Sequence, residues 1–520
     1  METFKSHSPA VSRLCTSGVV ILLVVSTCYA ATAHNNRDGD KFSEDPLENV
    51  KVSIGESRLI HVTDERYLSV AWTIGDLRKH WHNVNLSSVL LQTLAKGLSP
   101  SYLRFGGTRA NLATFKEKSL SSNARMKKFF FTGTDWDRIN DFSRSVGWSF
   151  IFDVNAFWRR DNTWDPTNFE ALLKYNDGRG YNVTAWQLGN EPDGYKRSMN
   201  VSISPKQVAA DYIRLQEVLT VREKTAKSFI IGPDVTKPHQ KLERQKLEGH
   251  PISFLEGFLS ECGNCTNVTT FHSYYLQVKS ASLDDFYDPA VLNTLAFEIH
   301  EVRKQVRKYR PHRPKIWLTE TGDSVPGGVS GISDRYVGGF PFLDKLGTGA
   351  KNGLDVVMKQ QFIGRFCGLV DSTNTEARPV YWVAYIHKRL VGERVLNVST
   401  NIQTETLRIY AHCTQTRYGK YSPGAVTLIV INLHKSNSYQ LDLQGTIGNN
   451  NKEEHLMTPS GTDGIQARYV SLNNIKLEML NDRQFPELSS RLLTPKQTIK
   501  LPPLTYGFYV IPKANLKICK

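Results

Sequence analysis

The chain has 520 residues, 40% of them hydrophobic and 22% charged, which is enough for one large domain and a smaller one. Its formal net charge is +15 and its pI about 9.3, so its surface attracts polyanions: nucleic acid, anionic membrane or acidic polysaccharide. Because the sequence has neither zinc-finger spacing nor the aromatic signature of RNA-binding modules, we expect no nucleic-acid partner.

The N-terminus has the features of a secretory signal peptide. Lys5 and Arg13 precede an apolar run at residues 19–25, and Cys28-Tyr29-Ala30 places small residues at a cleavage site. We predict cleavage after Ala30 and a secreted, extracellular protein, with the lysosome as a second location. A signal anchor is the alternative, but the run is short for a membrane span of about 20 residues, and no later stretch is long enough. Residues 31–48 are polar and predicted to be flexible.

Five cysteines follow the signal peptide, so at least one thiol stays unpaired within the chain. Cys262 and Cys265 are spaced like half of a metal site, but no second pair matches them, which favours a local disulfide. Sequons for N-glycosylation occur at Asn85, Asn182, Asn200, Asn264, Asn267 and Asn397.

Strand-like and helical patterns alternate through the first three quarters of the chain. After short strand-like runs at residues 50–52, 59–62 and 67–72, seven buried strands are predicted at 102–105, 149–154, 185–188, 228–232, 268–272, 315–319 and 354–358. Helical patterns are predicted at 87–96, 168–177, 205–221, 251–260 and 289–309. This α/β alternation predicts a (β/α)₈ barrel over residues 66–388.

From residue 389 the strands follow one another without helices. They are predicted at 407–412, 425–431, 441–443, 497–501 and 506–511, which indicates an antiparallel β-sandwich over residues 389–520. We expect the strands within residues 49–65 to join this sandwich, because no helix separates them.

Polar residues stand at the end of almost every predicted barrel strand. In a (β/α)₈ barrel these ends form the active site. The residues are Arg104 with Thr108, Asp153 with Asn155, Asn190 with Glu191, Asp234, His272 with Tyr274, Glu320 and Gln360.

Two of these residues, Glu191 and Glu320, provide the carboxyl pair that glycoside hydrolysis requires. A glutamate that only caps its strand is the alternative for Glu191 taken alone. Beside Asn190 and Trp186, Glu191 suits the acid/base, and Glu320 suits the nucleophile, with His272 and Tyr274 placed to hold it. No metal and no organic cofactor are implied.

Several motifs resemble those of heparanase-type enzymes, the retaining endo-β-glucuronidases of glycoside hydrolase family 79. They are Y-L-R-F-G-G-T (102–108), W-Q-L-G-N-E-P (186–192), G-P-D-V (232–235), F-H-S-Y-Y-L (271–276), W-L-T-E-T (317–321), S-D-R-Y-V-G-G-F (333–340), L-D-K-L-G (343–347) and Y-G-F-Y-V-I (506–511). The resemblance implies a barrel with a β-sandwich, Glu191 as acid/base, Glu320 as nucleophile and a disulfide between Cys413 and Cys519.

The chain also departs from the family pattern. Vertebrate heparanases have a long excised linker after the Y-L-R-F-G-G-T strand, whereas about 25 residues separate Thr108 from Gly133 here, so we expect a single chain without activating excision. The family has W-E-L-G-N-E-P and G-E-T-S-S where this chain has Gln187, Thr319 and Gly322. Thr73 and Cys367 replace an acidic residue and a tyrosine of the family's sugar subsite. Gly327 and Gly328 are retained, and their N–H groups are expected to bind the uronate carboxylate.

The expected substrate is an anionic glycosaminoglycan, and the loops after the catalytic strands favour heparan sulfate, whose sulfates need cationic partners. The basic residues in these loops are Lys196, Arg197, Lys237, Lys241, Arg244 and Lys279. Hyaluronan, the substrate of leech enzymes in the same family, is the alternative, and a solvated basic surface is the simpler interpretation of these loops. A non-catalytic glycosaminoglycan-binding protein is a third hypothesis. We expect a monomer.

Overall fold

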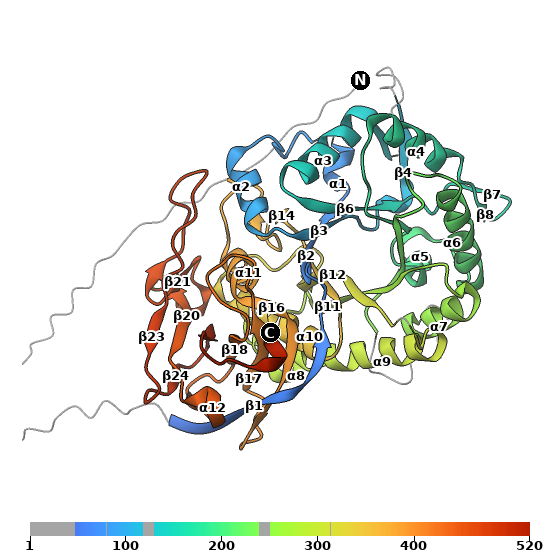
Figure 1. Ribbon diagram of the computed structural model, residues 1–520. Coiled ribbons are helices and arrows are strands. Elements are labelled where there is room, and N and C mark those ends of the chain that lie inside the picture. Colours follow the sequence, from blue (N-terminus) through green and yellow to red (C-terminus); the bar gives the residue numbers. More distant parts are fainter. Residues whose placement is uncertain (1–46, 80, 118–128, 239–249, 313) are drawn as a thin grey trace, which may run out of the picture. The chain divides into compact units, whose positions relative to one another are not determined.

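The computed structural model describes residues 47–520 except residues 80, 118–128, 239–249 and 313 (Figure 1). The predicted signal peptide, residues 1–30, lies outside this range, as do residues 31–46 of the segment that we predict to be flexible. The last two residues of that segment belong to strand β1 (Leu47–Val62) instead. Among the described residues, no helix combines the length and the apolar composition that a membrane span requires.

Eight parallel strands close into a barrel, which confirms the predicted fold. Their order around the barrel is β10-β11-β12-β13-β2-β3-β6-β9. The bounds are β2 (Leu68–Thr73), β3 (Ser101–Gly106), β6 (Trp148–Val154), β9 (Ala185–Leu188), β10 (Phe229–Val235), β11 (Val268–Gln277), β12 (Ile316–Val325) and β13 (Val356–Gln360).

Helices follow the barrel strands and lie outside the barrel (Figure 1). A capping box between Thr132 and Asp135 starts α3, and a proline in the first turn starts α6, α7 and α11. The predicted helix at 289–309 is divided at Asn293 into α8 and α9. The bounds are α1 (Gly75–Arg78), α2 (Val89–Gly97), α3 (Gly133–Ser145), α4 (Thr167–Arg179), α5 (Tyr195–Met199), α6 (Pro205–Thr220), α7 (Pro251–Cys262), α8 (Pro289–Leu292), α9 (Thr294–Tyr309), α10 (Gly339–Lys351) and α11 (Pro379–Leu390).

Short strand pairs and 3₁₀ turns decorate the barrel loops. The pairs are β4 (Ala113–Lys116) with β5 (Phe129–Thr132), β7 (Arg159–Arg160) with β8 (Thr163–Trp164), and β14 (Ile363–Gly364) with β15 (Val370–Asp371). The turns used below are η1 (Ala110–Leu112) and η2 (Pro192–Gly194).

The C-terminal region forms an 11-stranded sheet that includes the N-terminal strand β1, as predicted. The order is β22-β21-β20-β25-β18-β17-β16-β1-β19-β24, with β23 paired to β20. The pairing of β1 with β16 is antiparallel, but its pairing with β19 is parallel, an exception to the predicted antiparallel sheet. The bounds are β16 (Val391–Thr400), β17 (Leu407–Thr414), β18 (Val426–Asn432), β19 (Ser438–Leu443), β20 (Lys452–Ser460), β21 (Tyr469–Leu472), β22 (Ile475–Lys476), β23 (Arg491–Leu493), β24 (Ile499–Leu501) and β25 (Thr505–Ile511), with helix α12 (Gly445–Gly448) after β19.

Alternate residues of this sheet are buried in two different cores. Ile429 and Phe508 belong to the core that also contains the barrel helices, while Leu428 and Tyr509 face a second core shared with Val50 and strands β19 and β24. The period of two along a strand explains this division. The sheet thus curls over its own core and packs its other face on the barrel side.

Both predicted disulfides are present, Cys262–Cys265 and Cys413–Cys519, and Cys367 is a buried free thiol. All six sequon asparagines are exposed, although the side chain of Asn267 accepts a hydrogen bond from the Ile230 N–H.

Candidate active site

The turn after β9 presents Glu191 at the carboxyl end of the barrel. All four residues of β9 are buried, and the strand ends at Gly189, which has φ +78°. Glu191 itself has φ +55°, and Pro192 then starts η2. This sharp turn explains why the strand stops here and directs the Glu191 side chain away from the barrel wall.

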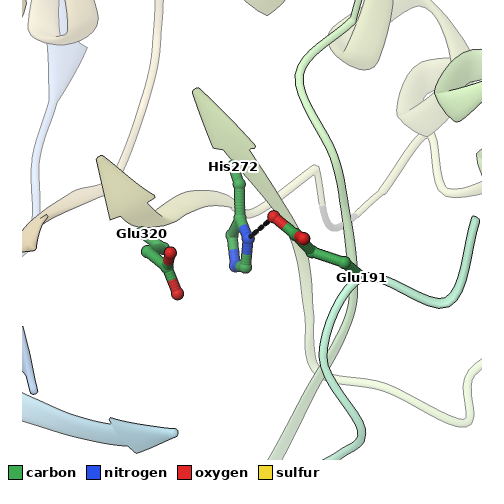
Figure 2. Close-up of side chains that lie close together, drawn as sticks. All are labelled: Glu191, His272 and Glu320. Carbon is green, nitrogen blue, oxygen red and sulfur yellow. Dashed lines mark hydrogen bonds and ion pairs between the residues drawn. The ribbon is translucent and has the colours of Figure 1, made fainter. Parts of the chain in front are cut away.

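Glu320 lies on β12, opposite Glu191, with His272 of β11 between them (Figure 2). One carboxylate oxygen of each glutamate and one ring nitrogen of His272 all lie within 4.8 Å of one another. The Glu191 side chain is 27% exposed and that of Glu320 is 13% exposed, so a ligand can reach both.

His272 contacts Glu191 rather than Glu320, which corrects the expectation that it would hold Glu320. Its Nδ1 lies 2.9 Å from Glu191 Oε1 (Figure 2), and its Nε2 lies 3.0 Å from Asp234 Oδ2. Burial alone would lower the pKa of His272, but Asp234 and Glu320 outweigh it and raise this pKa to about 10. The ring is therefore an imidazolium: its Nδ1–H donates to Glu191, and its Nε2–H faces Asp234 without a well-formed hydrogen bond.

Arg104 on β3 and Tyr274 on β11 hold Glu320. Arg104 Nη1 donates to Glu320 Oε2 over 3.0 Å, and the Tyr274 hydroxyl donates to Oε1 over 2.8 Å. Arg104 is 1% exposed, so its guanidinium contacts Glu320 from within the barrel as a buried ion pair. The prediction that Tyr274 holds Glu320 is confirmed.

Asn111 is a site residue that the sequence did not reveal. Its side chain bonds both backbone groups of Asn190: Oδ1 accepts from the Asn190 N–H over 2.9 Å, and Nδ2 donates to the Asn190 carbonyl over 3.0 Å. Asn111 is fully buried in η1, a 3₁₀ turn outside any strand or helix pattern, so periodicity gave no signal for it. The side chain of Asn190 in turn accepts from Arg104.

The remaining predicted substrate contacts lie around the two glutamates. Thr108 is exposed just after β3, where a Cβ on the neighbouring Gly107 would lie 4.0 Å from Glu320 Oε2. Gln360 ends β13, and its buried Oε1 has no hydrogen-bond partner among the described residues.

Gly327 and Gly328 form a turn with positive φ, +76° and +84°. A Cβ on Gly328 would lie 2.8 Å from the backbone nitrogen of Cys367, so the two backbones touch and only glycine fits. Cys367 thus borders the glycine turn, as the resemblance implied for the tyrosine that it replaces.

The predicted basic residues differ in exposure and in whether an acidic side chain already contacts them. Lys196 and Arg197 are exposed on α5, directly after the Glu191 turn, and Lys279 is exposed after β11. Lys237 is partly committed, because its Nζ lies 3.3 Å from the buried Glu298. Lys241 and Arg244 lie outside the described residues.

The Glu191–His272–Glu320 group has the composition of a metal site, but its donors are already used. Both nitrogens of His272 face carboxylates, and Glu320 accepts from Arg104 and Tyr274. An imidazolium has no lone pair for a metal. A cavity of about 790 Å³ lies elsewhere, between residues 81–87 and α3, and contains no comparable group of side chains.

Residues 66–347 match the family model "Glycosyl hydrolase family 79, N-terminal domain". The chain belongs to glycosyl hydrolase family 79. This family 79 chain is 32% identical to heparanase from Gallus gallus over 91% of its own length and 97% of the relative's. It is therefore a glycoside hydrolase of the heparanase type.

Two other relatives are named for a different activity or for the lack of one. Hyaluronoglucuronidase from Hirudo nipponia is 28% identical over 91% of this family 79 chain and 100% of its own length. Inactive heparanase-2 from Homo sapiens is also 28% identical, over 91% and 90%. A solved structure, a 4-O-α-L-rhamnosyl-β-D-glucuronidase from Fusarium oxysporum, shares the fold with a TM-score of 0.64 at 16% identity, covering 89% of this chain and 100% of that one.

Proposed function

We propose that this protein is a secreted, monomeric, retaining endo-β-D-glucuronidase that cleaves heparan sulfate, with Glu191 as acid/base and Glu320 as nucleophile. The observation that carries the proposal is the close approach of the two carboxyl groups, which have oxygens within 4.8 Å of each other. Retaining glycosidases separate their carboxyl groups by about 5–5.5 Å, and inverting ones by more, to admit a water molecule.

The surroundings of the two glutamates support this division of roles. Glu320 accepts from Arg104 and Tyr274, which favour its ionised form and leave it poised to attack the anomeric carbon. Glu191 is the more exposed of the two, and His272 orients it. Glu191 would give its proton to the leaving oxygen as Glu320 bonds the sugar, and would then deprotonate the water that releases it.

The choice of heparan sulfate rests on exposed cations beside the acid/base. The Arg197 guanidinium folds back over Gly194, with Nη2 3.1 Å from the position of a Cβ there. Its charge therefore lies over the turn that carries Glu191. Sulfate groups bind such guanidinium and ammonium groups as phosphates do. Hyaluronan is the second candidate, because its uronate needs only the site around Gly327 and Gly328.

Sizing the products made from heparan sulfate and from hyaluronan in parallel tests the substrate. We expect heparan sulfate to shorten and hyaluronan to stay long, and the reverse result would assign the protein to the hyaluronan-cleaving enzymes. Shortening of neither chain by a folded protein that binds both would support a non-catalytic role instead.

The Glu320→Gln variant tests the nucleophile. We expect turnover to fall by at least about 10³-fold with substrate binding retained, because the amide cannot form the covalent intermediate. Proton NMR of the first product anomer checks retention, and an initial α-anomer, or a Glu320→Gln variant at near wild-type rate, would refute the mechanism. For secretion, mass spectrometry of protein from the culture medium should find an N-terminus at Ala31.

A further inference from the structure

Asp153 is a buried carboxyl beneath the two glutamates whose state the mechanism above leaves open. It lies on β6, is 0% exposed, and its nearest cationic atom is Arg104 Nη2 at 3.5 Å. Neither of its oxygens has a well-formed hydrogen bond to any residue that the structure describes. An ionised carboxylate buried in this way would be very costly.

Arg104 directs four of its five N–H groups to acceptors other than Asp153. The two hydrogens of Nη2 are directed to Asn190 Oδ1 and Asp234 Oδ2, each at 2.7 Å. Nε donates to Gln187 and Nη1 to Glu320. The guanidinium thus serves other acceptors while it lies against Asp153.

The groups that face Asp153 act on its pKa in both directions, and burial is the largest influence. Burial raises the pKa of Asp153 well above its ordinary value, Arg104 and the Gly107 N–H offset this in part, and Asp234 adds to it. His272 faces it as a cation. Tyr195 and Tyr212 also face it, and burial raises the pKa of each well above its ordinary value, so both stay neutral.

The ion pairs around Asp153 are complete without it. Arg104 pairs with Asp234 at 2.7 Å and with Glu320 at 3.0 Å. His272 pairs with Asp234 at 3.0 Å and with Glu191 at 2.9 Å. A charge on Asp153 would add a third carboxylate beside Arg104, facing that of Asp234.

We propose that Asp153 is a positioning residue that acts as a neutral carboxylic acid: it fills the space beneath Arg104 and leaves the whole guanidinium charge to Glu320, Asn190 and Asp234. The role in the reaction rests on the proposed function, but the protonation state does not. Gln187 completes the arrangement, because its Oε1 accepts from Arg104 and its Nε2 donates to Asp234 and to the Gly189 carbonyl. An ionised glutamate, the residue that the sequence pattern of the family has here, would have no hydrogen to donate to either acceptor.

Infrared difference spectroscopy tests the protonation state without any substrate. We expect the wild-type spectrum at pH 7 to contain a carboxylic-acid C=O band that is missing from Asp153→Asn and that shifts when aspartate is ¹³C-labelled. The control is Asp344→Asn, because Asp344 is a second buried aspartate with a raised pKa, caused first by burial. Its substitution should remove a different band. If Asp153→Asn does not fold, the spectrum of Asp344→Asn decides the question. It should keep an acid band that shifts when aspartate is ¹³C-labelled, and the absence of any such band would overturn the proposal.

Kinetics on the cleaved glycosaminoglycan test the positioning role. Asp153→Ala leaves the space beneath Arg104 empty and should lower kcat by at least about tenfold, whereas Asp153→Asn, which replaces a neutral group by a neutral group, should restore kcat without moving the pH profile. Gln187→Glu adds a charge beside Asp234 and should lower kcat by at least about tenfold. The double variant Asp153→Asn/Gln187→Glu should stay as slow as Gln187→Glu alone. A large loss in Asp153→Asn that Gln187→Glu restores would show that Asp153 supplies a negative charge and would overturn the proposal, while an inactive wild type would refute the proposed function but not the infrared result.

Discussion

At the scale of single residues, two cations, one tyrosine and one amide hold the catalytic pair in place: Arg104, His272, Tyr274 and Asn111. Arg104 reaches Glu320 from below, and His272 reaches Glu191 from the side. Asn111 fixes the backbone of Asn190, the residue before Glu191, so a shift of Asn111 would displace the Glu191 carboxyl group. Rates fall steeply when a catalytic group moves by a fraction of its bonding distance.

We predict that Asn111→Ala lowers kcat by about 10–100-fold and changes KM little, because three buried hydrogen bonds, worth about 1 kcal/mol each, are lost: two to the backbone of Asn190 and one from the Tyr195 hydroxyl. Asn176→Ala is the matched control: Asn176 is also buried and bonds the Trp136 indole and the Tyr181 carbonyl, but within α4 and away from the site. Steady-state kinetics and thermal melting of both variants separate the two effects. Equal kcat losses in the two variants would contradict a role for Asn111 beyond stability.

At the scale of elements, the turn after β9 connects packing to chemistry. Gly189 lies under the ring of Tyr195, and a Cβ at Gly189 would approach the Tyr195 hydroxyl oxygen to 2.2 Å and Ala156 Cβ to 2.7 Å. Its φ of +78° is strained for any other residue. The turn therefore tolerates no side chain at this position.

Gly189→Ala should destabilise the fold by more than about 3 kcal/mol and inactivate what remains folded, since overpacking and strain add. Gly180→Ala offers a comparison with similar φ, +69°, at the end of α4, where a Cβ meets nothing within 4 Å, and should cost only about 1 kcal/mol. Chemical denaturation measures both. Similar losses would mean that backbone strain alone, and not the contact with Tyr195, limits this turn.

The sequence predicts elements better than it predicts contacts across the barrel. The strands at 102–105, 149–154 and 185–188 are found almost as expected, because runs of buried residues between helical patterns have few other solutions. The pair Glu191 and Glu320 follows from the rule that strand ends converge. The partner of His272 does not follow, because distances between side chains on different strands depend on tilt and rotamer, and Asn111 lies in a turn that no periodicity marks.

At the scale of the whole molecule, the barrel and the sheet share a junction that contains buried histidines. His412 on β17 is 1% exposed, its Nδ1 pairs with the Gly392 carbonyl at 2.9 Å, and His387 of α11 and His61 of β1 are close enough to add to the cost of charging it. Burial is the main cause that lowers the pKa of His412 to about 4. The ring is therefore neutral in the folded protein at pH 6.

Acid should weaken this junction. In the unfolded state His412 has its ordinary pKa of about 6.5. Below that pH the unfolded state therefore binds a proton that the folded state does not bind. The free energy of unfolding falls as the pH falls from about 6.5 to 4. The decrease in the free energy of unfolding that His412 alone causes approaches about 3 kcal/mol. Urea unfolding at pH 7 and pH 4.5 should show a smaller difference for His412→Gln than for wild type. His82→Gln, at an exposed position, serves as control and should leave the difference unchanged.

Strand β1 lies between β16 and β19, although more than 320 residues of sequence separate Val62 from Val391. During synthesis at about 5–20 residues per second, this strand emerges on the order of 15–60 s before its partners exist. For that time it is an unpaired edge with apolar residues such as Val50 and Val52, which invites pairing with other nascent chains. The native sheet is therefore a late product of translation, and chaperone supply in the producing cell, more than final stability, should decide how much protein is recovered.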